Sequence, residues 1–402
     1  MLILILDPKA LPPTGFALFN LGFRPFFLVA ALWAVLAMAF LGLTLALTLA
    51  HPSAALPFSA SWHGHEMLFG YAVAVIAGFL LTAARNWTGG RTPQGVPLAA
   101  MLALWAAPRL LLPFAPPALL PVLAAADVGF DLLLAAVLIR TLWRNPANRL
   151  IFPPLLLVLA LANLAWWLAM LGLWPAGHAM GLALGQGAVI GVLLVMGVRV
   201  APFFIEKRLN VPVTSRVPAR AYRTGAVLYA LLVLAGLFGV SWFEAGLAAA
   251  LGLLAAWVLW RWHAPGLWRE PLLWILWLSG AWLVLGLLLV AIGQAAGHAG
   301  LAGAARHALL AGGLGLATIG MMARVTLGHT GRAVYPPARG TLPAFLLVLA
   351  GAVLRVLAPV VDPAALAWAA PLTAMLWVLG FAFFFAIHAP MLLRPRVDGK
   401  PG

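Results

Sequence analysis

The chain has 402 residues, of which 65% are hydrophobic and only 8% are charged, and its mean hydropathy is +1.06. A soluble globular protein is roughly half apolar and about a quarter charged, so this composition excludes one. The absence of cysteine excludes disulfides, iron–sulfur clusters, thiolate zinc sites and covalently attached c-type heme. The net charge of +15 comes from basic residues scattered between apolar segments, which argues against nucleic acid as a partner.

Apolar segments of about twenty residues predict twelve transmembrane helices, and segments of this length favour a helical bundle over a β-barrel. In chain order the predicted spans cover residues 25–48, 65–85, 96–112, 120–142, 151–172, 178–198, 221–241, 243–262, 271–293, 304–326, 342–360 and 366–390. The N-terminal stretch lacks the pattern of a removable signal peptide. The sequence therefore predicts an all-α membrane protein in which residues 1–402 form a single transmembrane domain.

The basic residues predict the orientation of these spans. With the twelve spans above, 21 of the 24 lysines and arginines fall on one side of the membrane. Positive charge is retained in the cytoplasm, so that side is expected to be cytoplasmic. The prediction is a multi-pass protein of the bacterial inner membrane with both its N- and C-termini in the cytoplasm.

An internal repeat is suggested by three similar segments. Residues 74–85 align without a gap on 188–199 and more weakly on 313–324, and each segment ends in arginine. These segments belong to the second, sixth and tenth spans, which are rich in glycine and are therefore expected to be central. The prediction is three pseudo-equivalent four-helix units over residues 20–145, 146–265 and 266–395.

The nine histidines are distributed unevenly across the predicted membrane. Six lie on the non-cytoplasmic side, in loops or first helical turns, namely His51, His63, His65, His178, His298 and His307. Ionisable side chains at membrane depth are costly and usually face a bundle interior, so convergent histidines suggest a site. The alternative is that they are interfacial residues without a ligand.

The densest polar cluster is Trp62-His63-Gly64-His65-Glu66-Met67 at the start of the second span. Imidazole is a common ligand of heme iron and copper, and a nearby carboxylate can orient the ring or relay protons. We therefore expect His65 and His307 to bind heme iron, Glu66 to relay protons, and His63 and His178 to bind a second metal. Further candidate metal ligands are His51, His298 and His329.

Two arginines lie inside predicted spans, Arg109 in the third and Arg355 in the eleventh. A buried guanidinium needs an anionic partner, and heme propionates would supply one through paired hydrogen bonds. The carboxylates of Asp127, Asp131 and Asp362 are the alternative partners within the chain, and extension toward the outer interface is a third possibility.

Several ordered motifs of this chain resemble the NnrS family over almost the entire length. They are Phe23-Arg24-Pro25-Phe26-Phe27, Trp62 to Met67, Gly78 to Thr82, Asn86-Trp87-Thr88-Gly89, Arg199 to Phe204 and Arg324 to Arg332. One departure is Ala84-Arg85, where many members have proline before Asn86. The resemblance implies a bacterial heme- and copper-containing inner-membrane protein linked to nitric oxide metabolism and nitrosative stress.

The predicted architecture is also similar to the catalytic subunit of heme-copper oxidases, a group that includes respiratory nitric oxide reductases. Twelve helices in three units, with histidines near the outer ends of the second, sixth and tenth spans, carry this analogy. The analogy is incomplete because residues 222–241 of the seventh span hold no histidine for a three-histidine copper site. Function must still be argued from the site.

Three functions remain open at this point. The first is a protein with heme b, and with copper or another second metal, that binds nitric oxide and reduces it with electrons from quinol or a redox protein. The second is a non-catalytic nitric oxide scavenger or sensor, or a protein that handles heme or copper. The third is a secondary transporter, against which a three-part repeat argues. Motifs for nucleotide-driven transport or soluble-type hydrolysis are absent from the sequence.

Overall fold

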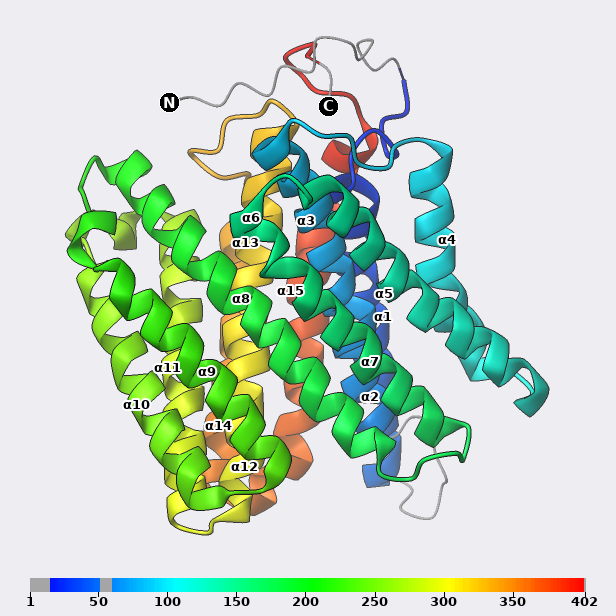
Figure 1. The fold of residues 1–402 in the computed structure, drawn as a ribbon, viewed down its shortest axis with the longest axis vertical. Coiled ribbons are helices and arrows are strands. Elements are labelled where there is room, and N and C mark those ends of the chain that lie inside the picture. The colour runs from blue at the N-terminus through cyan, green and yellow to red at the C-terminus, as the bar shows by residue number, and fades with distance from the viewer. Residues whose placement is uncertain (1–14, 51–59, 401–402) are drawn as a thin grey trace.

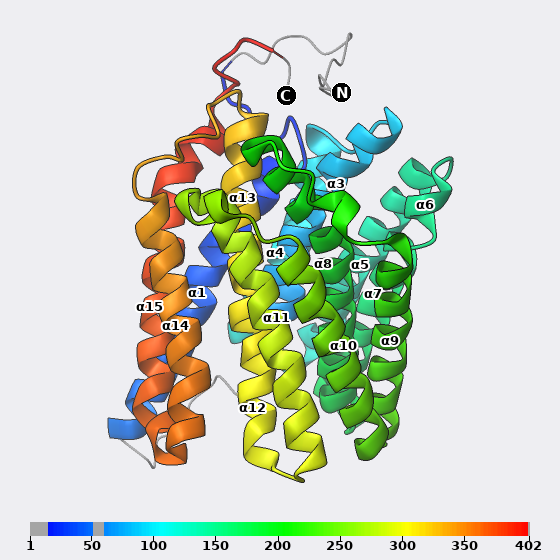
Figure 2. The ribbon, with the colours of Figure 1, turned by 90° about the vertical axis from the view of Figure 1, so that its left-hand side faces the viewer.

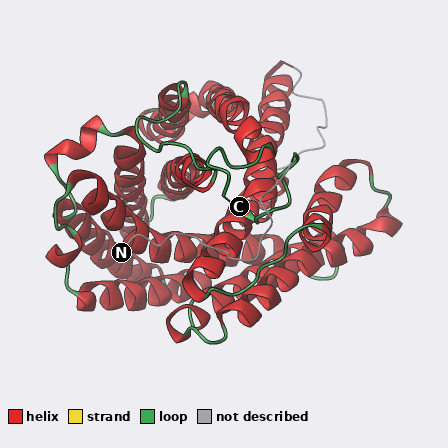
Figure 3. Ribbon diagram, turned by 90° about the horizontal axis from the view of Figure 1, so that it is seen from above, coloured by secondary structure: helices red, strands yellow, loops and turns green. Residues whose placement is uncertain are grey.

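The computed structural model describes residues 15–50 and 60–400, and these residues form helices joined by short loops, without strands (Figures 1 and 3). Twelve helical segments are long and apolar enough to cross a membrane. Their order and positions confirm the twelve predicted spans. The largest difference is the sixth span, which continues through Pro202 to Leu209 instead of ending near residue 198.

The first six spans are built from α1 (Phe23–Ala50), α2 (Ala60–His65), η1 (Glu66–Ala72), α3 (Val73–Thr88), α4 (Val96–Leu111), η2 (Leu112–Phe114), η3 (Pro117–Leu119), α5 (Leu120–Leu142), α6 (Pro146–Arg149), α7 (Phe152–Met170) and α8 (Gly177–Leu209). The last six comprise α9 (Ala219–Phe238), α10 (Ser241–Arg261), α11 (Pro271–Ala295), α12 (Ala299–His307), η6 (Ala308–Leu314), α13 (Gly315–His329), α14 (Thr341–Val361), η7 (Pro363–Ala365) and α15 (Leu366–Leu393). Two 3₁₀ turns, η4 (Thr214–Arg216) and η5 (Pro265–Arg269), lie in loops.

The helices pack mostly against their neighbours in sequence, and contact between α1 and α15 brings the first and last spans together (Figure 2). The backbone N–H of Ala17 donates to the carbonyl of Leu393 at 2.9 Å, so the chain enters the first span and leaves the last at the same end of the bundle. An even number of crossings requires this arrangement. It fits the predicted placement of both termini on one side of the membrane.

The second and tenth spans form the centre of the bundle. Their most apolar windows are 89% and 78% buried, against 56% or less for every other span in the described residues. The sixth span is only 39% buried, so the expectation that it is equally central was wrong. Gly181 in this span instead allows close packing against α7, because a Cβ at this position would lie 2.5 Å from the carbonyl oxygen of Ala162.

The two central spans each contain a π-helical segment directly after a candidate histidine. The segment η1 begins at Glu66, after His65, and η6 begins at Ala308, after His307. Wider helical turns displace backbone carbonyls from their regular partners, and such segments are frequent at functional sites. Side chains from neighbouring helices bond to a carbonyl in each segment: Trp105 Nε1 donates to Gly70 O at 3.1 Å, and Ser279 Oγ donates to Gly313 O at 2.8 Å.

The matching positions of these segments fit the first and third predicted repeat units, because 308 − 66 gives a spacing of 242 residues. The sixth span, in the second unit, is a continuous α-helix. The three-unit repeat stays a prediction, as does the similarity to heme-copper oxidases.

The packing of η6 leads to a first prediction. A Cβ on Gly312 would overlap the indole ring of Trp282, whereas a Cβ on Gly303 in the same span has no atom within 4 Å. Overpacking a tight interface costs about 1–3 kcal/mol. Gly312→Ala should therefore lower the thermal unfolding temperature of the purified protein, measured by size-exclusion chromatography after heating, and Gly303→Ala should not. Equal unfolding temperatures for the two variants would mean that this contact does not constrain η6.

Candidate functional site

Four deeply buried ionisable groups meet in one cluster toward the end of the bundle opposite the chain termini, which we call the outer end. His65, Glu66, Arg109 and Asp127 come from α2, η1, α4 and α5, and each is at most 3% exposed. We call these four residues the ionic cluster. A charged group buried within a membrane protein requires opposite charges and hydrogen bonds nearby. In this cluster the two basic side chains and the two acidic side chains supply these partners to one another.

The imidazole of His65 is fixed on every side. Its Nδ1 donates to Glu66 Oε1 at 2.9 Å, and its Nε2 donates to Asn163 Oδ1 at 3.0 Å, with Asp127 Oδ2 at 3.3 Å. The amide nitrogen of Asn163 donates to Asp131 Oδ2 at 2.8 Å, so its amide oxygen is the atom that faces His65. Because oxygen acceptors face both ring nitrogens, each carries a proton, and in this arrangement neither offers a lone pair to a metal.

Arg109 is the second cation of the ionic cluster. Its Nη1 donates to Asp127 Oδ1 and, at 3.1 Å, to the carbonyl of Trp105, while its Nε lies 3.5 Å from Glu66 Oε2. Each carboxylate also accepts a hydrogen bond from an indole N–H group. Trp167 donates to Asp127 and Trp33 donates to Glu66, both at 2.9 Å. Arg109 thus has the protein carboxylates that were the alternative to a heme propionate.

A second group lies near the outer ends of the two central spans and α14. His63, His307 and Arg355 are close enough to interact electrostatically, and we call these three residues the outer histidine group. The Nδ1 of His307 donates to Gly303 O at 2.8 Å, which leaves its Nε2 as the nitrogen with a lone pair. The Nδ1 of His63 is buried and has no hydrogen-bond partner.

Arg355 differs from Arg109 in its surroundings. It makes no ion pair with any carboxylate among the described residues, and its electrostatic neighbours are the cation Arg306 and the two histidines. The two arginines occupy similar places in the first and third predicted units, yet only Arg109 is compensated within the chain. A partly buried guanidinium beside imidazoles, without its own carboxylate, is suited to an external anion.

Among the other predicted metal ligands, His178 packs beside the ionic cluster, and its Nε2 is buried without a hydrogen-bond partner. The ring of Trp166 stacks on His65 at a centroid distance of 3.8 Å and contacts His178 at 5.4 Å, so it packs against both rings. His298 is exposed in the loop before α12, and His51 lies outside the described residues. His329 is at the opposite end of the tenth span, where its ring packs on Phe23 and its carbonyl accepts from Arg396.

The residues present fit heme better at the outer histidine group than at the ionic cluster. Axial ligation needs an unprotonated ring nitrogen, which His307 presents and His65 does not. Propionates need a cation without a carboxylate partner, and Arg355 has none among the described residues. Arg109 already faces Asp127 and Glu66, although its Nη2 has no hydrogen-bond partner. No group of three or more histidine or acidic side chains suited to a metal ion occurs in the part of the chain that the structure describes.

Sequence reasoning missed the residues that hold the ionic cluster in place, Asn163, Trp166 and Trp167. A signal was available: Asp127 and Asp131 are four residues apart within an apolar span and so share one helical face. Asn163 is an isolated amide in the next span. Carboxylates and an amide on adjacent membrane helices predict a polar network between them.

These features define a multi-pass helical membrane protein with a compensated ionic cluster beside an uncompensated histidine–arginine group. A family model described as NnrS protein matches residues 17–396, nearly the whole chain. The chain therefore belongs to the NnrS family, and this membership supports a membrane protein tied to the nitric oxide response. A search of curated proteins finds no match.

The compensation within the ionic cluster generates a second prediction. Asp127→Asn removes the main anionic partner of Arg109, and leaving a buried charge unpaired costs about 3–5 kcal/mol. We expect a clear fall in the yield of monodisperse protein and in its thermal unfolding temperature. Asp362→Asn is the matched control, because Asp362 is exposed and caps only a single 3₁₀ turn. If both variants behaved like the wild type, the cluster would not be needed for stability.

Proposed function

We propose that this protein binds heme b through the outer histidine group and uses it to bind and reduce nitric oxide, which protects the cell against nitrosative stress. We place it in the bacterial inner membrane with both termini cytoplasmic. The observation that carries the proposal is the pairing of His307, whose Nε2 is available, with Arg355, which has no carboxylate partner among the described residues. Membership of the NnrS family supports the link to nitric oxide.

In this proposal His307 is the first ligand of the heme iron. Its hydrogen bond to Gly303 O fixes the ring and strengthens Nε2 as a ligand, as outer partners of metal-bound histidines commonly do. Arg355 would pair with a propionate. The adjoining π-helical turn, which begins at Ala308, displaces the backbone next to this ligand.

His63 has two possible roles beside the heme. It would bind a second metal such as copper, or it would bind the heme iron together with His307. The earlier assignment of His65 to the heme iron requires His65 to exchange its partners Glu66 and Asn163 for the metal. Binding of a propionate by Arg109 likewise requires displacement of Asp127.

Heme supplies an iron centre that binds nitric oxide and passes electrons to it. Reduction joins two molecules of nitric oxide: an N–N bond forms, one N–O bond breaks, and two electrons and two protons yield nitrous oxide and water. Glu66 is the proposed proton relay, because its carboxylate contacts His65 and Trp33 next to the outer histidine group. The proposed electron donor is a quinol or a redox protein.

The alternative function is non-catalytic: scavenging or sensing of nitric oxide, or the handling of heme or copper. If both His63 and His307 bind the same iron, no coordination position stays open for a gas. The proximity of these two histidines favours this alternative over transport.

The third prediction tests the ligand assignment by absorption spectra of protein purified from heme-replete cells. His307→Ala should lose the reduced heme bands, Arg355→Gln should weaken heme retention, and His65→Phe should keep the bands if the protein folds. His263→Ala is the control, because His263 lies at the cytoplasmic end and is bonded to Trp268. Loss of heme in His65→Phe with retention in His307→Ala would reverse the assignment, and wild-type protein without heme would refute the proposal.

The fourth prediction concerns turnover. Glu66→Gln keeps the shape of the side chain but removes its capacity to relay a proton, which typically lowers the rate of proton-dependent chemistry by about 100-fold. We expect anaerobic production of nitrous oxide from nitric oxide and dithionite to fall accordingly. The shift of the reduced heme bands on adding nitric oxide should persist. Unchanged turnover would exclude Glu66 as the relay, and a wild-type protein that binds nitric oxide without forming nitrous oxide would favour a scavenger.

A further inference from the structure

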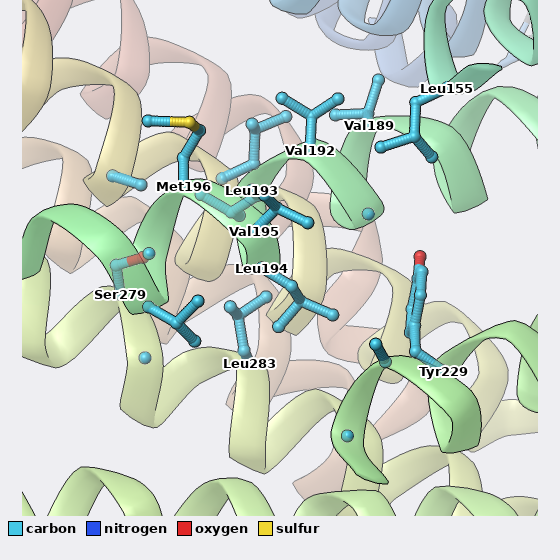
Figure 4. A pocket seen from close by; sticks show the side chains of 18 of the residues that line it. Leu155, Val189, Val192, Leu193, Leu194, Val195, Met196, Tyr229, Ser279 and Leu283 are labelled. Atoms are coloured by element: carbon cyan, nitrogen blue, oxygen red, sulfur yellow. The ribbon is translucent and has the colours of Figure 1, made fainter. Parts of the chain in front are cut away.

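A cavity of about 620 Å³ lies between α3, α7, α8, α9, α10, α11 and α13 (Figure 4). Aliphatic side chains such as Val192, Leu194 and Leu283 make up most of its wall. This volume is in the range of small-molecule sites. On α9 the lining runs from Ala221 to Leu234, thirteen residue steps or about 20 Å along the helix. The cavity is therefore long enough for an extended apolar ligand.

No charged residue lines this cavity in the part of the chain that the structure describes. An anionic lipid headgroup inside it would find no cation to compensate its charge, so the lining selects a neutral ligand. Three of the polar side chains on the wall are already committed: Tyr229 donates to Gly187 O at 2.6 Å, Ser279 to Gly313 O at 2.8 Å, and Thr318 to Leu314 O at 2.7 Å.

Two polar atoms in the wall have no hydrogen-bond partner outside the pair that they form, and both are at the end near the start of α9. They are the hydroxyl of Tyr222 and the indole N–H of Trp262, both of which are buried. Their rings are neighbours at a centroid distance of 6.4 Å, and Trp262 is only 6% exposed. If the indole donates to the hydroxyl, the hydroxyl proton still lacks an acceptor, which is unfavourable in a buried site, and a carbonyl oxygen would supply one. An apolar cavity with paired donors at one end suits an amphiphile with a neutral, carbonyl-bearing head.

The wall of the cavity is also connected to the candidate site. Thr318, which lines the cavity, lies 2.5 Å through its Oγ1 from the hydroxyl of Tyr71. Tyr71 belongs to η1, the π-helical segment that follows His65, and it is fully buried. One hydrogen bond therefore joins the cavity wall to the second span.

We infer that this cavity binds an isoprenoid quinone or quinol, with the head at Tyr222 and Trp262 and the tail along α8 and α9. The inference rests on the proposed function for its role but not for the binding itself. Oxidation of the quinol to the quinone releases two electrons and two protons, which are the numbers that convert two molecules of nitric oxide into nitrous oxide and water. The ligand would thus be the electron donor.

The test measures binding of ubiquinone-1 to the detergent-solubilised full chain by titration calorimetry. Gly197→Phe should abolish binding, because Gly197 lines the cavity and a Cβ there has no atom within 4 Å, so the new ring can occupy the space. Gly246→Phe is the matched control on the exposed face of α10, where a Cβ also meets no atom, and it should bind like the wild type.

A second variant tests the head position without filling the cavity. Tyr222→Phe combined with Trp262→Phe removes both donors and keeps an aromatic ring at each place, and it should weaken binding about tenfold. Saturable binding unaffected by Gly197→Phe, or no saturable binding to the wild type, would overturn the inference. So would binding that Gly197→Phe abolishes and the double variant leaves unchanged, because the cavity would then take only an apolar chain.

A further readout separates this inference from the proposed function. If heme is present, ubiquinol-1 should reduce it in the wild type and in Gly246→Phe but not in Gly197→Phe, while dithionite reduces it in all three. Reduction by dithionite and formation of nitrous oxide without saturable quinone binding would leave the proposed function standing and refute the quinone site. Quinone binding by a protein that holds no heme would support the site and refute the proposed function.

Discussion

Compensation of buried charge is the constraint on which the rest of this structure depends. Arg109 lies within the bundle and is held by Asp127 and Glu66, which in turn orient His65. A membrane interior offers no water to replace a lost partner, so the three spans that supply these residues must stay in register. The ionic cluster thereby fixes the outer end of the second span. His63 lies two residues before His65 and is close enough to His307 of the tenth span to interact with it electrostatically.

The two arginines in predicted equivalent positions have different partners, and this difference points to the functional group. Arg109 is neutralised within the chain, whereas Arg355 faces histidines and another cation. Both central spans carry a π-helical segment after a histidine. In our proposal the ionic cluster is structural and the outer histidine group binds the cofactor.

Much of the fold could be predicted from the sequence, because twenty consecutive apolar residues have few alternatives to a transmembrane helix. The extension of the sixth span to Leu209 could not, since Arg199 and Pro202 resemble the end of a span and the helix nevertheless continues through both. The π-helical segments were also missed, because they depend on partners such as Trp105 and Ser279 in other spans. The pattern of histidines indicated a site near the start of the second span, which stays a prediction. It could not show that His65 and His63, two residues apart, differ in their partners.

The most direct test of the account is a cryo-electron microscopy map of the heme-loaded protein bound to an antibody fragment for size. The account predicts density for a planar macrocycle beside His307, with a propionate against Arg355, and an ionic cluster in which Asn163 still contacts His65. Density for the macrocycle at His65, with Arg109 drawn away from Asp127, would contradict it.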